Sequence, residues 1–187
     1  MSEKKVSRGK SKIDWLKAGL DVLGTTSVAK ISVEALAKRL GIAKSGFYWH
    51  FDDRREYLNQ LLDYWYRETI GVIAENEQIN ELEPVTRLTT AVEMIIRHDL
   101  AKYELALHQW AMKDKRADKV VRKANRVRIE FANRIFTELG FDEDEITIRS
   151  MLTLIYQLWE EPTLKGIVSR KRRKELTKER IRFLTSK

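Results

Sequence analysis

Apolar residues recur at every third or fourth position along most of this 187-residue chain, which is the period of an amphipathic helix. No stretch shows the sustained alternation of apolar and polar residues that is typical of strands, and the chain has only two prolines and eight glycines. We therefore expect an all-α protein of about nine helices. The main helices are predicted at 13–23, 33–40, 43–50, 53–74, 84–97, 101–112, 114–139, 142–160 and 173–184.

The segment from residue 31 to residue 58 predicts two short helices and the start of a third. Ser32 is a favoured N-cap residue, and apolar residues follow it at helical spacing as far as Leu40. Gly41 can take the left-handed conformation that ends a helix. Asp53, with Glu56 three residues later, forms the pattern of a capping box at the start of the third helix. Two short helices joined by a glycine-containing turn indicate a helix-turn-helix.

The second short helix is expected to have a buried side and an exposed side. Phe47 and Phe51 are four residues apart and are expected to point inward. The other side is then free to enter a DNA major groove, which is about 12 Å wide. The residues expected nearer this outer side are Lys44, Ser45, Gly46, Tyr48 and Trp49.

Residues 41–51 read GIAKSGFYWHF, and through this string residues 12–58 resemble the DNA-binding domain of TetR-family transcriptional regulators. The family pattern is G-V-S-K-G-T-L-Y-x-H-F, and its spacing is kept without insertion or deletion. The chain departs from it at Ala43, at Ser45 and Gly46, and at Phe47, where the family has serine, glycine and threonine, and leucine. The resemblance implies a three-helix DNA-binding domain followed by a helical domain that binds a small-molecule effector and dimerises.

The DNA contacts are assigned from side-chain chemistry together with this resemblance. Arg54 is expected at a helix N-terminus, which suits a phosphate contact. Phosphate contacts are assigned to Lys44, Tyr48, His50 and Arg54, with a backbone N–H at or near Ser32, and base reading to Lys44, Ser45, Gly46 and Trp49.

Charge separates the chain into three parts. Residues 1–55 carry 12 basic and 6 acidic side chains, residues 56–164 carry 14 and 20, and residues 165–187 carry 10 and 2. A basic first part on an acidic second part points to a polyanionic partner for the first part only. We expect a DNA-binding domain at residues 1–55, with a flexible basic arm at residues 1–12, and an effector-binding and dimerisation domain at residues 56–187.

The helix predicted at residues 142–160 carries apolar residues around more than one face. A helix that packs against one neighbour needs a single apolar stripe, so the second face is interpreted as a dimer surface, while a central core helix is the alternative. In the TetR family the two C-terminal helices of each subunit form a four-helix dimer bundle. The predicted interface residues are Met151, Ile155, Leu158, Trp159, Leu176, Ile181 and Leu184.

Aromatic and polar residues are distributed over the helices that would surround the interior of the second domain. Ligand pockets use aromatic walls with a few polar groups, but aromatic residues at helical spacing are equally typical of a core. The resemblance favours the pocket, and its candidate residues are Trp65, Met94, His98, Tyr103, His108, Trp110, Phe131 and Tyr156.

Five adjacent cations occupy residues 170–174. Because they repel one another and cannot all be buried, we expect a solvated surface segment. An anionic ligand or a second contact with nucleic acid is the alternative.

The sequence offers no pattern for catalysis or metal binding. The three histidines lack the spacing of a zinc site, there is no cysteine, no phosphate-binding or nucleophile motif is present, and the carboxylates fall on predicted solvent faces. No apolar run is long enough for a membrane span, and the start of the chain lacks a signal peptide. We therefore expect no enzyme activity, no metal, no cofactor, no membrane contact and a cytoplasmic location.

These observations predict a homodimeric, sequence-specific DNA-binding transcriptional regulator, more specifically a repressor that a small-molecule effector of unknown identity releases from a palindromic operator. The alternative is a helical ligand-binding or protein-interaction module that has lost specific DNA reading. The missing hydroxyl at Ala43 is the main argument for that alternative.

Overall fold

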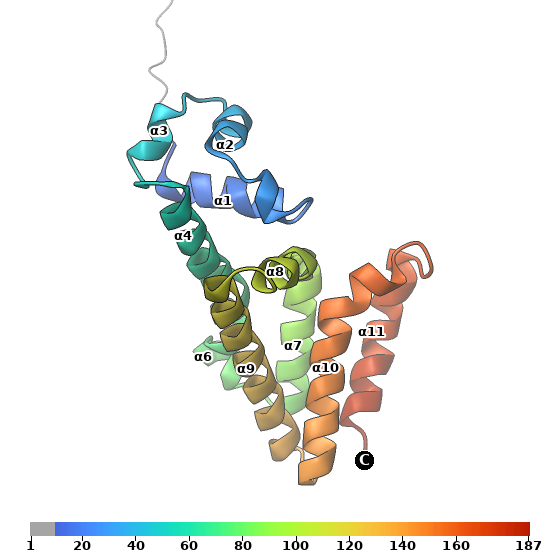
Figure 1. Cartoon of the computed structure of the whole chain (residues 1–187). Helices are drawn as coiled ribbons and strands as arrows, with labels where there is room; N and C mark the ends of the chain where they lie inside the picture. Colours follow the sequence, from blue (N-terminus) through green and yellow to red (C-terminus); the bar gives the residue numbers. More distant parts are fainter. Residues whose placement is uncertain (1–9) are drawn as a thin grey trace, which may run out of the picture.

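The computed structural model describes residues 10–187, apart from the side chain of residue 170. Within these residues every regular element is a helix, so the predicted all-α class is confirmed. Of the basic arm predicted at residues 1–12, residues 1–9 lie outside the described residues. Figure 1 shows the N-terminal helices gathered at one end and longer helices side by side at the other.

The N-terminal end consists of three helices and the start of a fourth. They are α1 (Lys12–Leu23), α2 (Val33–Leu40), α3 (Ser45–Tyr48) and α4 (Arg54–Tyr66), with a 3-10 turn, η1 (Val28–Lys30), before α2. The two helices predicted at 13–23 and 33–40 are confirmed. The helix predicted at 43–50 is shorter, because only Ser45–Tyr48 is helical and turns flank it.

Caps set the boundaries of these helices. The Ser32 hydroxyl accepts a hydrogen bond from the Ala35 N–H at 3.1 Å, and Gly41 ends α2 with φ +69°. The Asp53 carboxylate accepts from the Glu56 N–H at 2.7 Å, whereas the Glu56 carboxylate accepts from the N–H of Asp52 instead of Asp53. The predicted capping residues are thus confirmed, with the return bond shifted by one residue.

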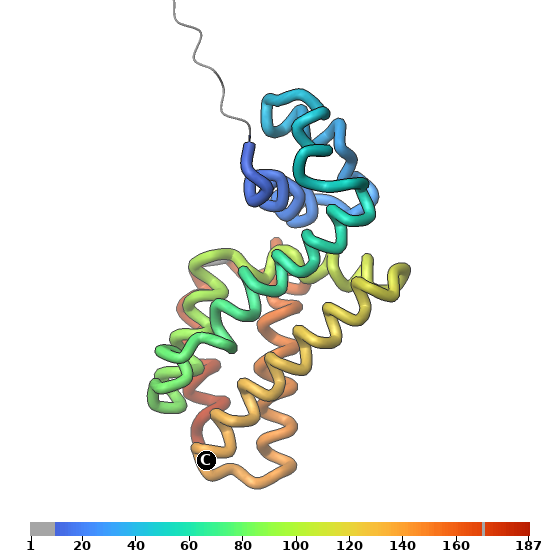
Figure 2. The backbone as a smooth tube through the Cα atoms, turned by 90° about the vertical axis from the view of Figure 1, so that its left-hand side faces the viewer, coloured from blue at the N-terminus to red at the C-terminus, as the bar shows by residue number. Residues whose placement is uncertain are grey.

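The chain from residue 54 to residue 74 follows one nearly continuous helical path. After α4 it passes through a π-helical segment, η2 (Arg67–Gly71), and then α5 (Val72–Ala74). A π-helical turn inserts extra backbone into a helix and is frequent at functional sites. Figure 2 shows this path leaving the N-terminal helices and running along the rest of the molecule, as the predicted lever helix does.

The remaining elements form the larger end of the molecule. They are α6 (Glu77–Asn80), α7 (Pro84–Arg97), the 3-10 turn η3 (Leu100–Tyr103), α8 (Glu104–Ala111), α9 (Lys115–Glu138), α10 (Glu143–Leu164) and α11 (Arg170–Thr185). α7 begins at Pro84, as predicted. α10 does not end at about Glu160, because the helix continues past Pro162 to Leu164.

Buried apolar residues form two clusters. The first joins the N-terminal helices to α4, α8 and the start of α9, from Trp15 to Ala124. The second joins α7, the later part of α9 and α11, and includes Phe136 and Leu184. The first cluster contains residues on both sides of the domain boundary expected at residue 55. Helix α4 therefore contributes to the core at both ends of the molecule.

The prediction that carboxylates lie on solvent faces is wrong for Glu104, which is buried. Its carboxylate forms two hydrogen bonds with the Arg128 guanidinium, at 2.6 and 3.1 Å. The partner lies 24 residues away on α9, so local periodicity cannot reveal this pair.

No helix in the described part of the chain is both long and apolar enough to cross a membrane.

One buried hydrogen bond joins α4 to α1 and gives a test of this packing. The Tyr57 hydroxyl donates to the Trp15 carbonyl at 2.9 Å. The hydroxyl lies against Gly19 of α1, where any larger residue would place its Cβ on top of the hydroxyl oxygen. Burial also raises the pKa of Tyr57 above its ordinary value, so the ring stays neutral and keeps this donor near neutral pH.

Tyr57→Phe removes the bond from the hydroxyl to the Trp15 carbonyl and is expected to reduce the free energy of unfolding by about 1 kcal/mol. Chemical denaturation of the full chain measures this loss. The control is Tyr48→Phe, because Tyr48 is exposed and its hydroxyl has no buried acceptor. Equal stabilities for the two variants would contradict the role of the Tyr57 bond.

Candidate nucleic-acid interface and ligand cavity

Helix α3 is held in place by aromatic packing on its inner side. Phe47 and Phe51 are buried, as predicted. The Phe47 ring lies edge-on to Trp15 at 5.4 Å between centroids, and the Phe51 ring lies edge-on to Tyr57 at 4.9 Å. Edge-to-face pairs of this kind add specific geometry to apolar burial, so α1 and α4 fix the orientation of α3.

The opposite side of α3 is open. Tyr48 is 61% exposed and Trp49 is 85% exposed, which is unusual for large aromatic side chains. Lys44 and Ser45 are also exposed. Gly46 is half-buried, and a Cβ there would face Ile42 and Trp15 at ordinary contact distances. The structure thus brings four of the five predicted outer residues to one surface and turns Gly46 inward.

Lys44 is paired but free to exchange its partner. Its ammonium lies 3.1 Å from the Glu34 carboxylate, and both side chains are more than half exposed. A hydrogen bond from the Glu34 N–H and the nearby Lys44 ammonium hold the pKa of the Glu34 carboxyl below its ordinary value. Exposed ion pairs contribute little free energy, so a DNA phosphate can replace Glu34 at small cost.

Three other predicted contacts use their side chains within the protein. The Arg54 guanidinium donates to the carbonyls of Ile31, at 2.7 Å, and Val28, at 3.0 Å. His50 Nε2 lies 2.9 Å from the Lys10 carbonyl oxygen, and the Ser32 hydroxyl caps α2. These bonds shape the turn before α2 and hold Lys10 beside α3, so the side chains position the surface.

An apolar cavity of about 90 Å³ lies between the helices of the larger end. It is lined by residues of η2, α5, α7, η3, α8, α9 and α10, and most of them are small or aliphatic. The lining residues are Thr69, Ile70, Ile73, Ala74, Leu88, Ala91, Val92, Ile95, Leu100, Ala101, Glu104, Arg128, Phe131, Ala132, Thr153, Leu154, Gln157 and Leu158.

Of the eight pocket residues predicted from the sequence, only Phe131 lines this cavity. Trp65 is fully buried in the first core cluster. Met94, His98 and Tyr103 line a separate groove beside α1, while His108 and Trp110 border two further hollows. Tyr156 packs on the Arg180 guanidinium, 3.8 Å from the ring centroid. The predicted residues are therefore spread between the core and the surface: some rings fill the core, and others border hollows outside this cavity.

The polar residues of the cavity were not singled out from the sequence. The Glu104–Arg128 pair borders it, and so does Gln157, whose buried carbonyl oxygen Oε1 has no hydrogen-bond donor among the described residues. In the sequence each of the three is one polar residue within a helical pattern, and their convergence depends on how α8, α9 and α10 pack.

The outer face of α10 is apolar and uncovered in the single chain. Ile148, Met151, Leu152, Ile155 and Trp159 are exposed along it, and Phe183 is exposed on α11. Of the predicted interface residues, Met151, Ile155 and Trp159 lie on this face. The assignment is wrong for Leu158, Ile181 and Leu184, because these pack inside the subunit, while Leu176 is partly buried.

The basic segment at residues 170–174 begins α11. Lys171, Arg172 and Lys174 are exposed as expected. Arg173 is an exception, since it is buried and its guanidinium forms a 2.6 Å ion pair with Glu161 of α10. This residue therefore joins the two C-terminal helices.

No cluster of three or more metal-ligating side chains occurs in residues 10–187.

Known protein families and solved structures share features with this chain. Residues 16–61 match the family model described as bacterial regulatory proteins, tetR family. No curated protein matches the chain.

Several solved structures share the fold over most of both chains. A TetR-family transcriptional regulator from Marinobacter aquaeolei has a TM-score of 0.69 at 15% identity, with 93% of this chain and 98% of that one covered. The transcriptional regulator FadR from Bacillus subtilis, solved in complex with stearoyl-CoA, has a TM-score of 0.66 at 16% identity, with 94% of this chain and 98% of that one covered. BioQ, solved with its double-stranded DNA operator, has a TM-score of 0.53 at 16% identity, with 94% of this chain and 98% of that one covered.

The family model and the fold confirm the resemblance seen in the sequence: this chain carries the TetR-family DNA-binding domain on the fold of TetR-family transcriptional regulators.

Proposed function

We propose that this protein is a repressor that binds a palindromic DNA operator as a homodimer and is released by a small-molecule effector. The observation that carries the proposal is the braced α3, with Tyr48 and Trp49 exposed on the side away from Phe47 and Phe51. The donors on this side are the Tyr48 hydroxyl, the Trp49 indole N–H and the Lys44 ammonium, and each can bond to phosphates or base edges. BioQ, which shares the fold, was solved with its DNA operator, and this supports the DNA partner.

The proposed division of labour follows the two ends of the molecule. Residues 1–55 hold the DNA-reading surface, and residues 56–187 hold the effector cavity and the dimer face. Lys44, Ser45, Tyr48 and Trp49 contact DNA directly. Ser32, His50 and Arg54 mainly fix the shape of the surface through bonds within the protein, although a backbone N–H near Ser32 remains able to meet a phosphate.

The dimer is proposed to form through the apolar face of α10 and the exposed Phe183 of α11. Exposed apolar residues in one continuous row mark interaction surfaces. A two-fold assembly presents two copies of α3, as half-sites one helical turn of DNA apart require. A palindromic operator is the sequence that such an assembly reads.

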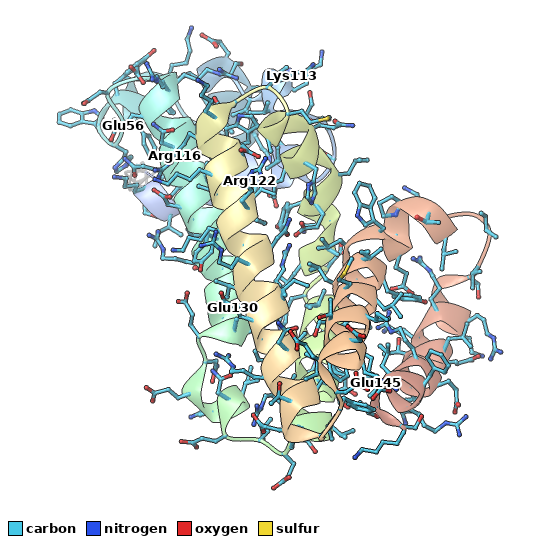
Figure 3. The ribbon with its side chains drawn as sticks, turned by 60° about the horizontal axis from the view of Figure 1, so that its bottom comes forward. Glu56, Lys113, Arg116, Arg122, Glu130 and Glu145 are labelled. Atoms are coloured by element: carbon cyan, nitrogen blue, oxygen red, sulfur yellow. The ribbon has the colours of Figure 1, made fainter. Side chains whose placement is uncertain are left out.

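The cavity is proposed to communicate with DNA through the path from α4 to α5. Thr69, Ile70 and Ile73 of this path line the cavity, and its other end carries the DNA-binding helices. The Arg116 guanidinium of α9 also pairs with Asp63 of α4 at 2.7 Å, and Figure 3 shows Arg116 on the α9 side next to α4. A ligand that binds more tightly when α4 is displaced shifts the population toward the released state.

The test of DNA reading is selection of duplexes from a random pool, followed by affinity measurements across salt concentrations. Lys44→Ala is expected to weaken binding to the selected duplex and to reduce the salt slope by about one. The matched control is Lys178→Ala, an exposed lysine on α11, which is expected to leave the slope unchanged. A pool without enrichment would favour the alternative of a module that has lost specific reading.

The test of the dimer is the molar mass in solution. Ile155→Lys places a charge in the centre of the proposed interface and is expected to convert a dimer into a monomer with unchanged helix content. Ile13→Lys is the matched control, because Ile13 on α1 is 52% exposed and Ile155 is 50% exposed. Light scattering with size exclusion gives the mass, and circular dichroism gives the helix content. A monomeric wild-type chain would refute the proposed assembly.

A further inference from the structure

The cavity between α7, α9 and α10 has apolar walls and very few polar groups, so those groups decide which ligand it favours. Its volume of about 90 Å³ is smaller than the roughly 150 Å³ of an engineered cavity that holds benzene. A first ligand is therefore compact and apolar. Among the lining residues only Glu104 and Arg128 carry a formal charge.

The two members of this ion pair differ in how easily each can leave. The Glu104 side chain is 2% exposed and the Arg128 side chain is 19% exposed. Glu104 is the first residue of α8, where the helix dipole favours an anion. Arg128 lies on α9 beside Asn125, whose side-chain oxygen accepts one of its N–H groups at 3.3 Å. The carboxylate is fixed, whereas the longer guanidinium side chain can swing toward solvent.

This asymmetry selects the charge of the ligand. A cation that displaces Arg128 keeps the buried Glu104 carboxylate paired, and the guanidinium regains water. An anion that captures Arg128 leaves that carboxylate with only the imidazole of His108, whose Nε2 lies 3.9 Å away, in place of a guanidinium that is always charged, and weakening a buried pair in this way is costly. An anion that shares Arg128 places two carboxylates side by side in the same apolar surroundings.

Two neighbouring groups also suit a cationic hydrogen-bond donor. Gln157 is buried and lines the cavity, and its Oε1 has no donor among the described residues. An ammonium has three N–H donors, so after pairing with Glu104 it still has N–H groups for an unpaired acceptor of this kind. The Arg128 guanidinium carbon lies 5.8 Å from the Trp65 ring centroid, a distance at which the ring attracts a cation.

We propose that the cavity takes a compact, apolar primary amine in its protonated form, whose ammonium replaces the Arg128 guanidinium beside Glu104. This inference rests on the effector-release function proposed above and names the chemical class of the effector. The same exchange frees Arg128 on α9, which lies against the path that carries the DNA-binding helices.

Three compact probes of similar size and different charge test the proposal: butylammonium, 1-butanol and butanoate. Calorimetric titration of the full chain at neutral pH, without DNA, is expected to rank the ammonium on the order of tenfold tighter than the alcohol, with the carboxylate weakest. Tightest binding by the carboxylate, or no binding by the ammonium, would overturn the proposal.

Substitutions of the pair separate the charge argument from simple apolar binding. Arg128→Ala removes the group that the ligand must displace and is expected to tighten ammonium binding, whereas a site for anions would lose its affinity. Glu104→Gln is expected to abolish the preference for the ammonium over the alcohol. The control is Arg122→Ala, an exposed arginine that pairs with Asp118 on the same helix and is labelled in Figure 3.

If a substitution prevents folding, the order of affinities of the three probes for the wild-type chain still tests the proposed ligand class. In that case Arg128→Lys replaces Arg128→Ala, because it keeps the positive charge. Release of the selected duplex by each probe is measured separately. If the carboxylate binds most tightly and releases the duplex, the ligand class is wrong while the proposed function stands. If no duplex is selected at all, the proposed function fails while the ligand ranking remains informative.

Discussion

The packing of two phenylalanines against α1 and α4 is the constraint on which the DNA-reading surface depends. α3 has only four helical residues, Ser45–Tyr48, and a helix this short has no stability of its own. Its orientation comes from Phe47 and Phe51, which contact Trp15 of α1 and Tyr57 of α4. Because the inner side is fixed in this way, Tyr48 and Trp49 remain outside despite their apolar area.

The same contacts tie the DNA-reading surface to the rest of the molecule. Tyr57 belongs to α4, and α4 continues through η2 and α5 to the wall of the cavity. The first core cluster therefore includes residues of α1 and α9 together. In the proposed release mechanism, a displacement of η2 or α5 at the cavity passes along this path to the helices that hold α3.

Much of the fold follows from local patterns and is predictable from the sequence. Ser32, Asp53 and Pro84 mark helix starts, Gly41 marks an end, and the apolar period gives the length of each helix. These signals act over a few residues, so they can be recognised without knowledge of the tertiary packing. The prediction fails where contacts join distant segments: Glu104 and Arg128 are 24 residues apart, and Ile181 and Leu184 turn inward against the other helices of the subunit. The aromatic rule for the pocket fails because most of the predicted rings pack in the core or border other hollows, while the cavity lies mainly among small and aliphatic side chains.

The buried ion pair is the least expected feature of the larger end, and stability alone does not account for it. Two charges taken out of water cost more than they return unless their geometry is excellent, and apolar residues of the same volume often stabilise a core equally well. The geometry here is good, with two hydrogen bonds between Arg128 and Glu104. The pair nonetheless borders a cavity instead of filling it, and one member is far more accessible than the other. In such a pair the fixed carboxylate can serve as a binding site for a cation, and the side chain of Arg128 occupies that site when no ligand is bound. The proposed ligand exchange at Glu104 would give this buried charge a function that packing alone does not explain.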